Sequence, residues 1–304
     1  MAADNNLFLI LDGTAMLFRG YFSEAEKLSP GGVPVSGIYG IAKKIGPVMQ
    51  KFKPRYAAVV LDAGQYTFRN KIYPDYKMNR GDPPDSLKPQ FAMLANYFTA
   101  MGFAVFQKKN FEADDLAASL SHLAGHAGIN SLLHSNDKDL CQLVKDGTYW
   151  VRIYDPMKDI ILSEEEVFHK HGVMPHQFVD YLSLTGDASD NIPGGAQIGP
   201  KAAAAMLNDC GTLQQILKNP QIAISARVRG AGSLPDKINF SVKNIQLAQK
   251  LIPLKKNLKL NIHKENFKEK TRWTGVHSSA SLILENLGFS AGLKVLSELY
   301  KENY

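Results

Sequence analysis

Short apolar runs recur along the first half of the chain, and each is followed by a polar turn. The runs are Leu7–Leu11, Tyr56–Leu61, Phe103–Gln107, Ile129–His134 and Tyr149–Tyr154. Continuous apolar runs of this length are typical of strands that are buried on both faces, as in parallel sheets. The pattern therefore predicts five β-strands.

Segments with helical spacing lie between these strands. They are Ala15–Phe22, Ser36–Phe52, Leu87–Met101 and Asp114–His126. Strands that alternate with helices at this spacing predict an α/β domain with a mostly parallel central sheet. In open sheets of this kind, ligands bind beyond the carboxyl ends of the strands.

The pattern becomes helical after about residue 172. Helical spacing covers Pro175–Leu184, Pro200–Leu207, Leu213–Leu260 and Ser279–Tyr304, the last with Leu282, Leu284, Leu287, Phe289 and Leu293 as packing positions. A Gly-rich turn at about residues 191–204 predicts a helix–hairpin–helix, whose backbone N–H groups can bind phosphate. We expect an α/β core over residues 1–172 and a helical domain over residues 173–304.

Composition narrows the class of protein. The 304 residues are 45% hydrophobic and 21% charged, which is typical of a globular chain. No apolar run approaches the roughly 20 residues that span a bilayer, and residues 1–6 have no signal-peptide pattern. Cys141 and Cys210 lack metal-site spacing, which favours a reducing cytoplasm. The net charge of +6 is compatible with a polyanionic partner.

Carboxylates follow the predicted strand ends and recur in the hairpin region. In one cluster, Glu112 and Asp115 are three apart and share a face of a first helical turn, while Asp114 points elsewhere. Acidic residues also favour helix N-termini for electrostatic reasons alone. Four strands that deliver carboxylates to one edge nevertheless predict a common site. The full set is Asp12, Asp62, Glu112, Asp114, Asp115, Asp137, Asp139, Asp187 and Asp190.

So many carboxylates in one pocket would repel one another unless cations neutralised them. Oxygen-only ligands, without nearby cysteine or paired histidine, favour Mg²⁺ or Mn²⁺ over Zn²⁺. Two such ions about 4 Å apart could activate a water and stabilise a leaving oxygen. A basic protein with one acidic pocket therefore fits phosphodiester hydrolysis without a catalytic histidine, although each carboxylate alone is more often a turn or cap residue.

The chain resembles the flap endonuclease/5′-nuclease family, and most of all the N-terminal 5′→3′ exonuclease domain of bacterial DNA polymerase I. The matching stretches cover residues 11–21, 57–62, 67–69, 76–80, 112–115, 136–139 and 186–194. They include Leu-Asp-Gly-Thr, Tyr-Lys-Met-Asn-Arg, Glu-Ala-Asp-Asp and Gly-Asp-Ala-Ser-Asp-Asn-Ile-Pro-Gly. Together these stretches are highly specific. Beyond about residue 210 the match is loose.

The resemblance implies a PIN-like nuclease core followed by a helix–three-turn–helix domain. It implies that the carboxylates divide between two metal ions. Asp12, Asp62, Glu112 and Asp114 would serve the first ion, and Asp137, Asp139, Asp187 and Asp190 the second. Asp115 would lie near both ions and act in catalysis.

The resemblance also implies a helical arch or clamp at about residues 65–91, through or under which a single-stranded 5′ end passes. Lys77 and Arg80 would hold phosphate beside the metals as catalytic residues, and Tyr76 would stack on a displaced base. Arg19 and Arg69 would contact phosphate or support the clamp. Mixtures of Arg, Lys and Tyr also occur on ordinary solvated helix faces.

The hairpin departs from the family pattern at one position. Gly194, Gly199 and Lys201 match the pattern and are implied to bind the duplex backbone, in relatives commonly with a K⁺ ion. Gln197 stands where the family has glycine, and a side chain there is disfavoured if the backbone needs a positive φ. Gly195 is an additional glycine.

Three other classes of protein share part of this pattern. A haloacid dehalogenase phosphatase would need a nucleophilic Asp at position 10, which is Ile10. A Rossmann enzyme would need a glycine fingerprint after the first strand, which Asp-Gly-Thr does not supply. A non-catalytic binder of branched DNA is the remaining rival, although binding to a phosphate backbone requires no acidic pocket.

The sequence therefore predicts a monomeric, structure-specific 5′ nuclease acting in replication and repair. Its expected partners are 5′-flapped or branched duplex DNA and RNA–DNA primer junctions, recognised by shape over sequence. Whether it prefers flaps or ends, or RNA or DNA, stays open, as does whether it stands alone or is part of a polymerase.

Overall fold

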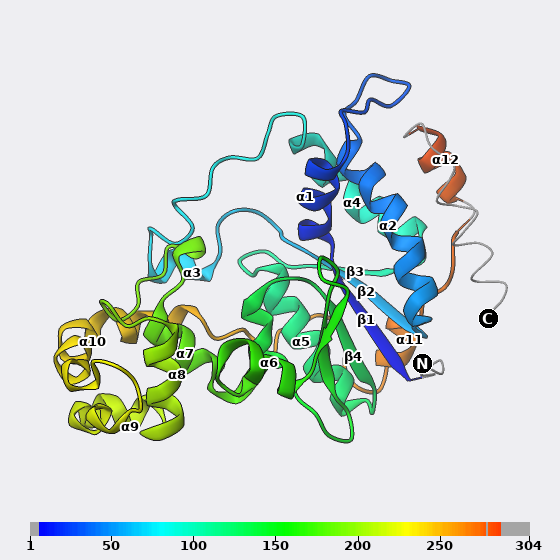
Figure 1. Cartoon of the computed structure of the whole chain (residues 1–304). Coiled ribbons are helices and arrows are strands. Elements are labelled where there is room, and N and C mark those ends of the chain that lie inside the picture. Colours follow the sequence, from blue (N-terminus) through cyan, green and yellow to red (C-terminus); the bar gives the residue numbers. More distant parts are fainter. Residues whose placement is uncertain (1–5, 278, 287–304) are drawn as a thin grey trace.

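The computed structural model describes residues 6–277 and 279–286 of the chain. A six-stranded sheet lies at the centre of these residues (Figure 1). Its strands are β1 (Leu7–Asp12), β2 (Tyr56–Leu61), β3 (Ala104–Gln107), β4 (Asn130–His134), β5 (Val151–Asp155) and β6 (Ile160–Leu162). The five predicted strands are confirmed and pair in parallel, whereas β6 pairs antiparallel with β5. The sequence does not predict β6, because a strand of three residues is too short to show a periodic pattern.

The strand order β3-β2-β1-β4-β5-β6 determines where a ligand can bind. The chain moves outward from β1 through β2 to β3, and then returns to the other side of β1 as β4. Such a reversal opens a crevice beyond the carboxyl ends of the strands. Asp12, Asp62 and Asp137 lie at or just past the ends of β1, β2 and β4, so the predicted edge of the sheet is the correct one.

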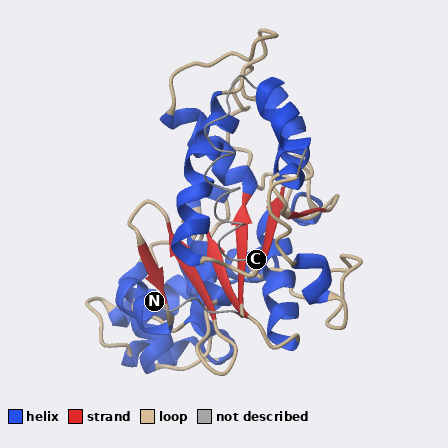
Figure 2. Cartoon of the chain, turned by 90° about the vertical axis from the view of Figure 1, so that its right-hand side faces the viewer, coloured by secondary structure: helices blue, strands red, loops and turns tan. Residues whose placement is uncertain are grey.

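Alternate side chains of β1 enter two different hydrophobic cores. Leu9 and Leu11 pack in one core, and Phe8 and Ile10 pack in the other. Figure 2 shows helices on both sides of the sheet. Because both faces are covered, the central strands are buried and read as continuous apolar runs. The helices of this half are α1 (Gly13–Ser23), α2 (Ser36–Phe52), α3 (Phe68–Ile72), α4 (Lys88–Ala100), α5 (Ala113–His126), η1 (Lys138–Leu143) and α6 (Glu164–His171).

Helices make up the second half of the described chain. They are η2 (Pro175–Gln177), α7 (Phe178–Thr185), η3 (Ala188–Asp190), α8 (Pro200–Asp209), α9 (Leu213–Lys218), η4 (Pro220–Ser225), η5 (Ala231–Ser233), α10 (Leu234–Leu251), α11 (Phe267–Thr271) and α12 (Ser279–Asn286). The helix predicted from Pro200 is confirmed. The stretch predicted as helical from Leu213 is divided, because Pro220 and the left-handed Gly230 interrupt it.

The segment after α10 returns to the α/β core. Trp273 is fully buried, and its indole N–H donates a 2.9 Å hydrogen bond to the Met101 carbonyl. The ring of Phe267 packs edge-on against Phe8, with centroids 5.0 Å apart. The end of the described chain therefore packs against the α/β core. The domain boundary at residue 172 stays a prediction.

Of the predicted C-terminal packing helices, the structure describes residues 279–286. In α12, Leu282 is 62% exposed, contrary to its predicted packing role, and Ile283 packs against the core instead. The predicted positions Leu287, Phe289 and Leu293 lie outside the described residues. No helix in the ranges that are described is long and apolar enough to cross a membrane.

Candidate active site

Two carboxylates at strand ends are positioned by helix N-termini. Asp12 ends β1 and caps α1, where its Oδ1 accepts a 2.9 Å hydrogen bond from the Ala15 N–H. Asp62 follows β2 and accepts a 2.8 Å hydrogen bond from the N–H of Ala113, the first residue of α5. The unpaired N–H groups of a helix start are natural partners for carboxylates. In addition, the Asp62 N–H donates to Thr14 Oγ1 at 3.0 Å.

Burial and mutual repulsion raise the pKa of carboxylates at this edge. The pKa of Asp12 is raised to about 7, first by burial and then by the charge of Asp62, while a hydrogen bond and Arg19 oppose the shift. Burial and the charges of Asp137 and Asp12 hold the pKa of Asp114 well above its ordinary value. Asp12, Asp62, Asp114 and Asp137 thus form one electrostatic group that a cation would stabilise.

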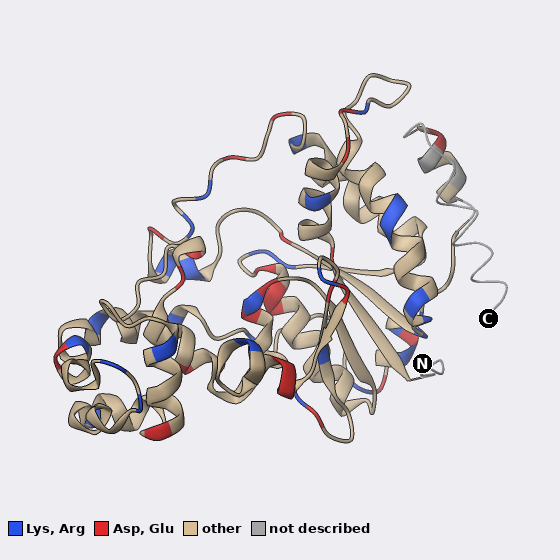
Figure 3. Cartoon of the chain, in the orientation of Figure 1, with Lys and Arg blue, Asp and Glu red and all other residues tan. Residues whose placement is uncertain are grey.

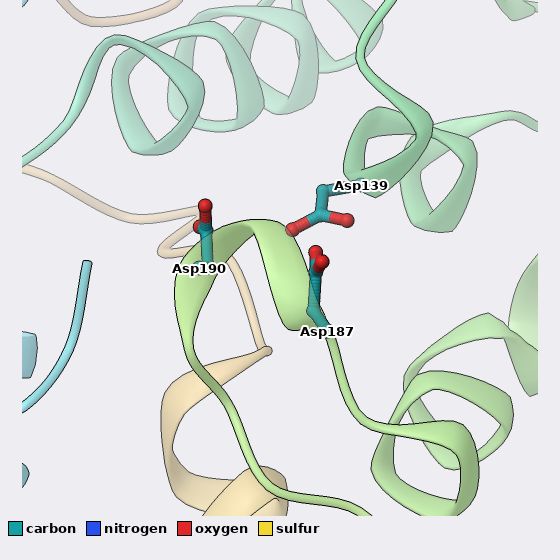
Figure 4. Close-up of side chains that lie close together, drawn as sticks. All are labelled: Asp139, Asp187 and Asp190. Atoms are coloured by element: carbon teal, nitrogen blue, oxygen red, sulfur yellow. The ribbon is translucent and has the colours of Figure 1, made fainter. Parts of the chain in front are cut away.

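A second group of carboxylates lies beside the first. Asp139 on η1 and Asp187 and Asp190 around η3 each offer an oxygen, and these atoms lie within 4.8 Å of one another (Figure 4). Burial, followed by the charges of Asp137, Asp187 and Asp190, raises the pKa of Asp139. Oδ1 of Asp139 is buried without a hydrogen-bond partner among the described residues. Three oxygen donors with one unsatisfied atom fit a hard divalent cation.

Short 3₁₀ turns hold this second group in place. Asp137 caps η1 and accepts a 2.8 Å hydrogen bond from the Asp139 N–H. Asp187 caps η3 and accepts hydrogen bonds from the N–H and the hydroxyl of Ser189, at 2.9 and 2.7 Å. Burial acts to raise the pKa of Asp187, but Ser189 and the Lys138 ammonium, 3.0 Å away, outweigh it, so the pKa is lowered. Asp187 is therefore ionised and available as a ligand.

Cationic side chains of the clamp segment reach into the carboxylates. Lys77 Nζ lies 2.9 Å from Glu112 and 3.5 Å from Asp190, and the Arg80 guanidinium pairs with Asp190. Burial acts to lower the pKa of Lys77, but the two carboxylates raise it overall, so the ammonium stays charged. Figure 3 shows Lys and Arg recurring along this segment and acidic positions gathered at the start of α5.

Tyr76 is placed differently from its prediction. Its side chain is 4% exposed, and its hydroxyl oxygen lies 3.1 Å from a Glu112 carboxylate oxygen and 3.0 Å from an Asp190 carboxylate oxygen, so its one proton is shared between them. A ring buried in this way presents no face to a displaced base, so stacking does not fit this arrangement. Tyr76 instead joins Glu112 to Asp190, and burial and these charges raise its own pKa.

Arg69 and Asp115 form a buried pair away from solvent. The two guanidinium nitrogens of Arg69 lie 2.7 and 2.9 Å from the two carboxylate oxygens of Asp115. Because Arg69 is 2% exposed, contact with DNA phosphate does not fit its position, whereas support of the clamp does. The prediction that Asp115 holds metal conflicts with its full engagement by protein donors.

Arg19 lies near the first carboxylate group. Its Nη1 donates a 3.0 Å hydrogen bond to Asn136 Oδ1, and its Nη2 is buried without a partner among the described residues. Burial lowers the pKa of Arg19, opposed by the charges of Asp12 and Asp155. Because this N–H donor has no partner among the described residues, Arg19 could still contact phosphate, and that contact stays a prediction.

The hairpin has the geometry that its glycines imply. A Cβ at Gly194 would lie 2.2 Å from the Gly186 nitrogen, so only glycine permits this approach. Gln197 has φ +57°, which is the left-handed backbone that disfavours side chains. Gly199 precedes α8 as its N-cap, and Lys201 is exposed on the first turn. The exposed positions are open to a duplex, and their contact with DNA stays a prediction.

Several residues that orient the site are not predicted by the sequence pattern. Thr14 and Ser189 orient Asp62 and Asp187, and both lie within the motifs that were recognised. Leu251 and Lys255 hold the Arg69–Asp115 pair through their backbone, which leaves no mark on side-chain identity.

Two family descriptions match adjacent parts of the chain. The first, "5'-3' exonuclease, N-terminal resolvase-like domain", covers residues 7–172, and the second, "5'-3' exonuclease, C-terminal SAM fold", covers residues 173–274. The chain belongs to the 5′–3′ exonuclease family. A 5′–3′ exonuclease of Aquifex aeolicus is 33% identical over 261 residues, which is 86% of each chain. The DNA polymerase I of Rhizobium leguminosarum is 33% identical over 226 residues, 72% of this chain but 22% of that protein.

Solved structures support the same fold for this 5′–3′ exonuclease-family protein. The D15 protein of bacteriophage T5, co-crystallised with metal ions, superposes with a TM-score of 0.67. The match covers 98% of this chain and all of the phage chain, at 20% identity. The T5 D15 flap endonuclease in complex with DNA and metal ions gives a TM-score of 0.66 at 21% identity, covering 98% of this chain and 99% of that one. At this identity the likeness shows the fold, a PIN-like α/β core followed by a helical domain.

Proposed function

We propose that this protein is a divalent-metal-dependent, structure-specific 5′ nuclease that hydrolyses phosphodiesters at 5′ flaps and 5′ ends of duplex DNA. One observation carries the proposal. Oxygens of Asp139, Asp187 and Asp190 converge beside the cationic Lys77 and Arg80, and Oδ1 of Asp139 has no hydrogen-bond partner in the part of the chain that the structure describes. The names of the relatives and the DNA and metal complex of the T5 flap endonuclease support the same reading.

The carboxylate oxygens fit Mg²⁺, with Mn²⁺ as a substitute. Asp12, Asp62, Asp114 and Glu112 would hold one ion, and Asp137, Asp139, Asp187 and Asp190 a second. When bound, such ions supply Lewis-acid stabilisation of the reacting phosphate and an activated water. Raised pKa values at Asp12, Asp114 and Asp139 are the expected signature of a carboxylate cluster that awaits positive charge.

Lys77 and Arg80 would bind the phosphate that is cut. Lys77 pairs with Glu112 and Arg80 pairs with Asp190. A substrate phosphate that enters the site would take the place of these carboxylates as the partner of the two cations. Positive charge fixed at this position stabilises the charge that develops in the transition state. Cleavage would leave a 5′-phosphate and a 3′-hydroxyl.

The helical half would bind the duplex. Gly194, Gly199 and Lys201 present backbone N–H groups and an ammonium to the phosphate backbone, independent of base sequence. RNA–DNA primer junctions would be accepted as well, which suits primer and flap removal in replication and repair. A K⁺ ion at this hairpin and a monomeric state stay predictions.

A 5′-labelled flap duplex tests the proposal. Cleavage near the junction is expected in Mg²⁺ or Mn²⁺, is expected to be absent in chelator, and should fall at least a hundredfold in Asp139→Asn. Tight binding of the flap without cleavage under any divalent ion would favour the alternative, a non-catalytic binder of branched DNA. Lys43→Met, which changes an exposed lysine of α2 that pairs with Glu24 and lies outside the predicted clamp, is a matched surface control.

A further inference from the structure

The buried Arg69–Asp115 pair uses every acceptor site of its carboxylate. Oδ1 of Asp115 accepts hydrogen bonds from Arg69 Nη2 at 2.9 Å and from the Lys255 N–H at 3.0 Å. Oδ2 accepts from Arg69 Nη1 at 2.7 Å and from the Glu112 N–H at 3.2 Å. An ionised carboxylate offers about four lone-pair sites, so Asp115 has none left for a cation.

Exchange of these partners for a metal ion is unfavourable. Arg69 and Asp115 are 2% and 0% exposed, so water cannot replace either partner. Withdrawal of Asp115 would leave a buried guanidinium with only the more distant Glu112, at 3.6 Å, as counter-charge. Bidentate pairs of this kind are among the strongest hydrogen-bonded contacts, and an unpaired buried charge is costly.

Three parts of the chain meet at this pair. Arg69 lies on α3, at the start of the clamp, and Asp115 lies on the first turn of α5. Arg69 Nε also donates a 2.8 Å hydrogen bond to the Leu251 carbonyl, where α10 ends. The Lys255 ammonium lies over the ring of Phe68, 4.9 Å from its centroid. The clamp, the metal-site helix and the end of α10 are therefore held by one contact.

We infer that Asp115 is a positioning residue that fixes Arg69, and with it the clamp, and that it is not a ligand of either metal ion. Its Oδ2 also holds the Glu112 N–H, so the pair sets the start of α5, on which Glu112 and Asp114 lie. The ligand set on this helix is then Glu112 and Asp114. The inference rests on the proposed function, because it assigns roles within the same site.

Binding of Mn²⁺, followed by electron paramagnetic resonance and calorimetry without DNA, separates the two roles. Asp114→Asn should weaken Mn²⁺ binding at least tenfold. Asp115→Asn should leave the number of bound ions unchanged and their affinity within about twofold. Loss of an ion or a tenfold weaker affinity in Asp115→Asn would overturn the inference. If the wild type binds Mn²⁺ but cuts no substrate, the proposed function fails while this result still decides the inference.

A double-mutant cycle on cleavage tests the coupling of the pair. Arg69→Gln and Asp115→Asn should each lower the single-turnover rate on a flap substrate about tenfold or more, with the metal concentration for half-maximal rate unchanged. The double variant should lose no more than the worse single variant, because both changes remove one contact. Multiplied losses would contradict the inference. Arg69→Lys, which keeps the charge, should recover part of the rate, and thermal melting identifies any variant that fails to fold.

Discussion

The ammonium of Lys77 lies 2.9 Å from the carboxylate of Glu112, although the two residues belong to different structural units. Lys77 comes from the irregular segment between α3 and α4, and Glu112 is the N-cap of α5. The backbone of Lys77 has φ +58°, and its N–H donates to the Asp190 carbonyl at 2.9 Å. Strained backbone of this kind persists where the surroundings hold it, often at functional sites.

Removal of this cation should slow cleavage strongly. We expect Lys77→Met to lower the single-turnover rate about 10²–10³-fold, because a preorganised charge at the reacting phosphate is lost. Lys77→Arg should retain more activity, since it keeps the charge. Flap binding, measured separately by fluorescence anisotropy, should weaken far less. A cleavage rate within twofold of wild type in Lys77→Met would contradict the assigned role.

His134 should make the fold sensitive to acid. It is 3% exposed at the end of β4, and burial, followed by the charge of Arg19, lowers its pKa to about 3. Because the unfolded chain binds a proton near pH 6.5 and the folded chain does not, stability is present above pH 6.5 and is lost as pH falls towards 3. Each pH unit that the pH falls in this window should lower the free energy of unfolding by about 1.4 kcal/mol through His134.

Thermal melting of His134→Gln beside the wild type measures that contribution. The difference in Tm between the two proteins should change steadily from pH 6.5 to pH 4, in favour of the variant at acid pH. A constant difference across this range would show that His134 takes up its proton as readily in the folded chain as in the unfolded chain, contrary to the lowered pKa.

Divalent ions should stabilise the fold most at alkaline pH. The pKa of Asp12 is raised to about 7, so the ion-free fold loses stability as pH rises from about 4 through 7. Mg²⁺ or Mn²⁺ binds the ionised form and should raise Tm by a few degrees at pH 8, and by less at pH 5. In chelator, Asp12→Asn should show a smaller fall in Tm between these pH values. The same ion-induced shift at both pH values would argue against this site.

Glycine at position 197 should stabilise the hairpin. Gln197 adopts φ +57°, which costs a residue with a side chain roughly 1–2 kcal/mol, whereas glycine adopts it freely. After the added entropy of glycine in the unfolded chain, Gln197→Gly should gain about 0.5–1 kcal/mol in the free energy of unfolding. Chemical denaturation gives this value directly.

Ala196 provides the matched control, because it does not have a positive φ. Ala196→Gly should lower the free energy of unfolding by about 0.5–1 kcal/mol, the opposite sign. Equal effects of the two glycine substitutions would mean that strain at position 197 is absent.

The sequence by itself determined the parallel sheet and the edge at which the site forms. Leu7–Leu11 and Tyr56–Leu61 are apolar runs whose side chains are buried on both faces of the sheet, so the local sequence is enough to identify them as strands. Asp12 ends β1 and Asp62 directly follows β2, and parallel strands bring such positions to one edge. The family has glycine where this chain has Gln197, which suggested that the backbone there needs a positive φ. The structure shows a positive φ at Gln197.

Only the tertiary structure decided which of these carboxylates remain free for a cation. Asp114 and Asp115 are adjacent in the sequence and carry the same side chain, yet Asp115 is fully engaged by Arg69, 46 positions away, and by the backbone of Lys255. Tyr76 likewise reads as an aromatic of a clamp, but its hydroxyl is buried between Glu112 and Asp190. Contacts between residues so far apart depend on how the packed elements meet, and residue type and spacing along the chain do not encode that geometry.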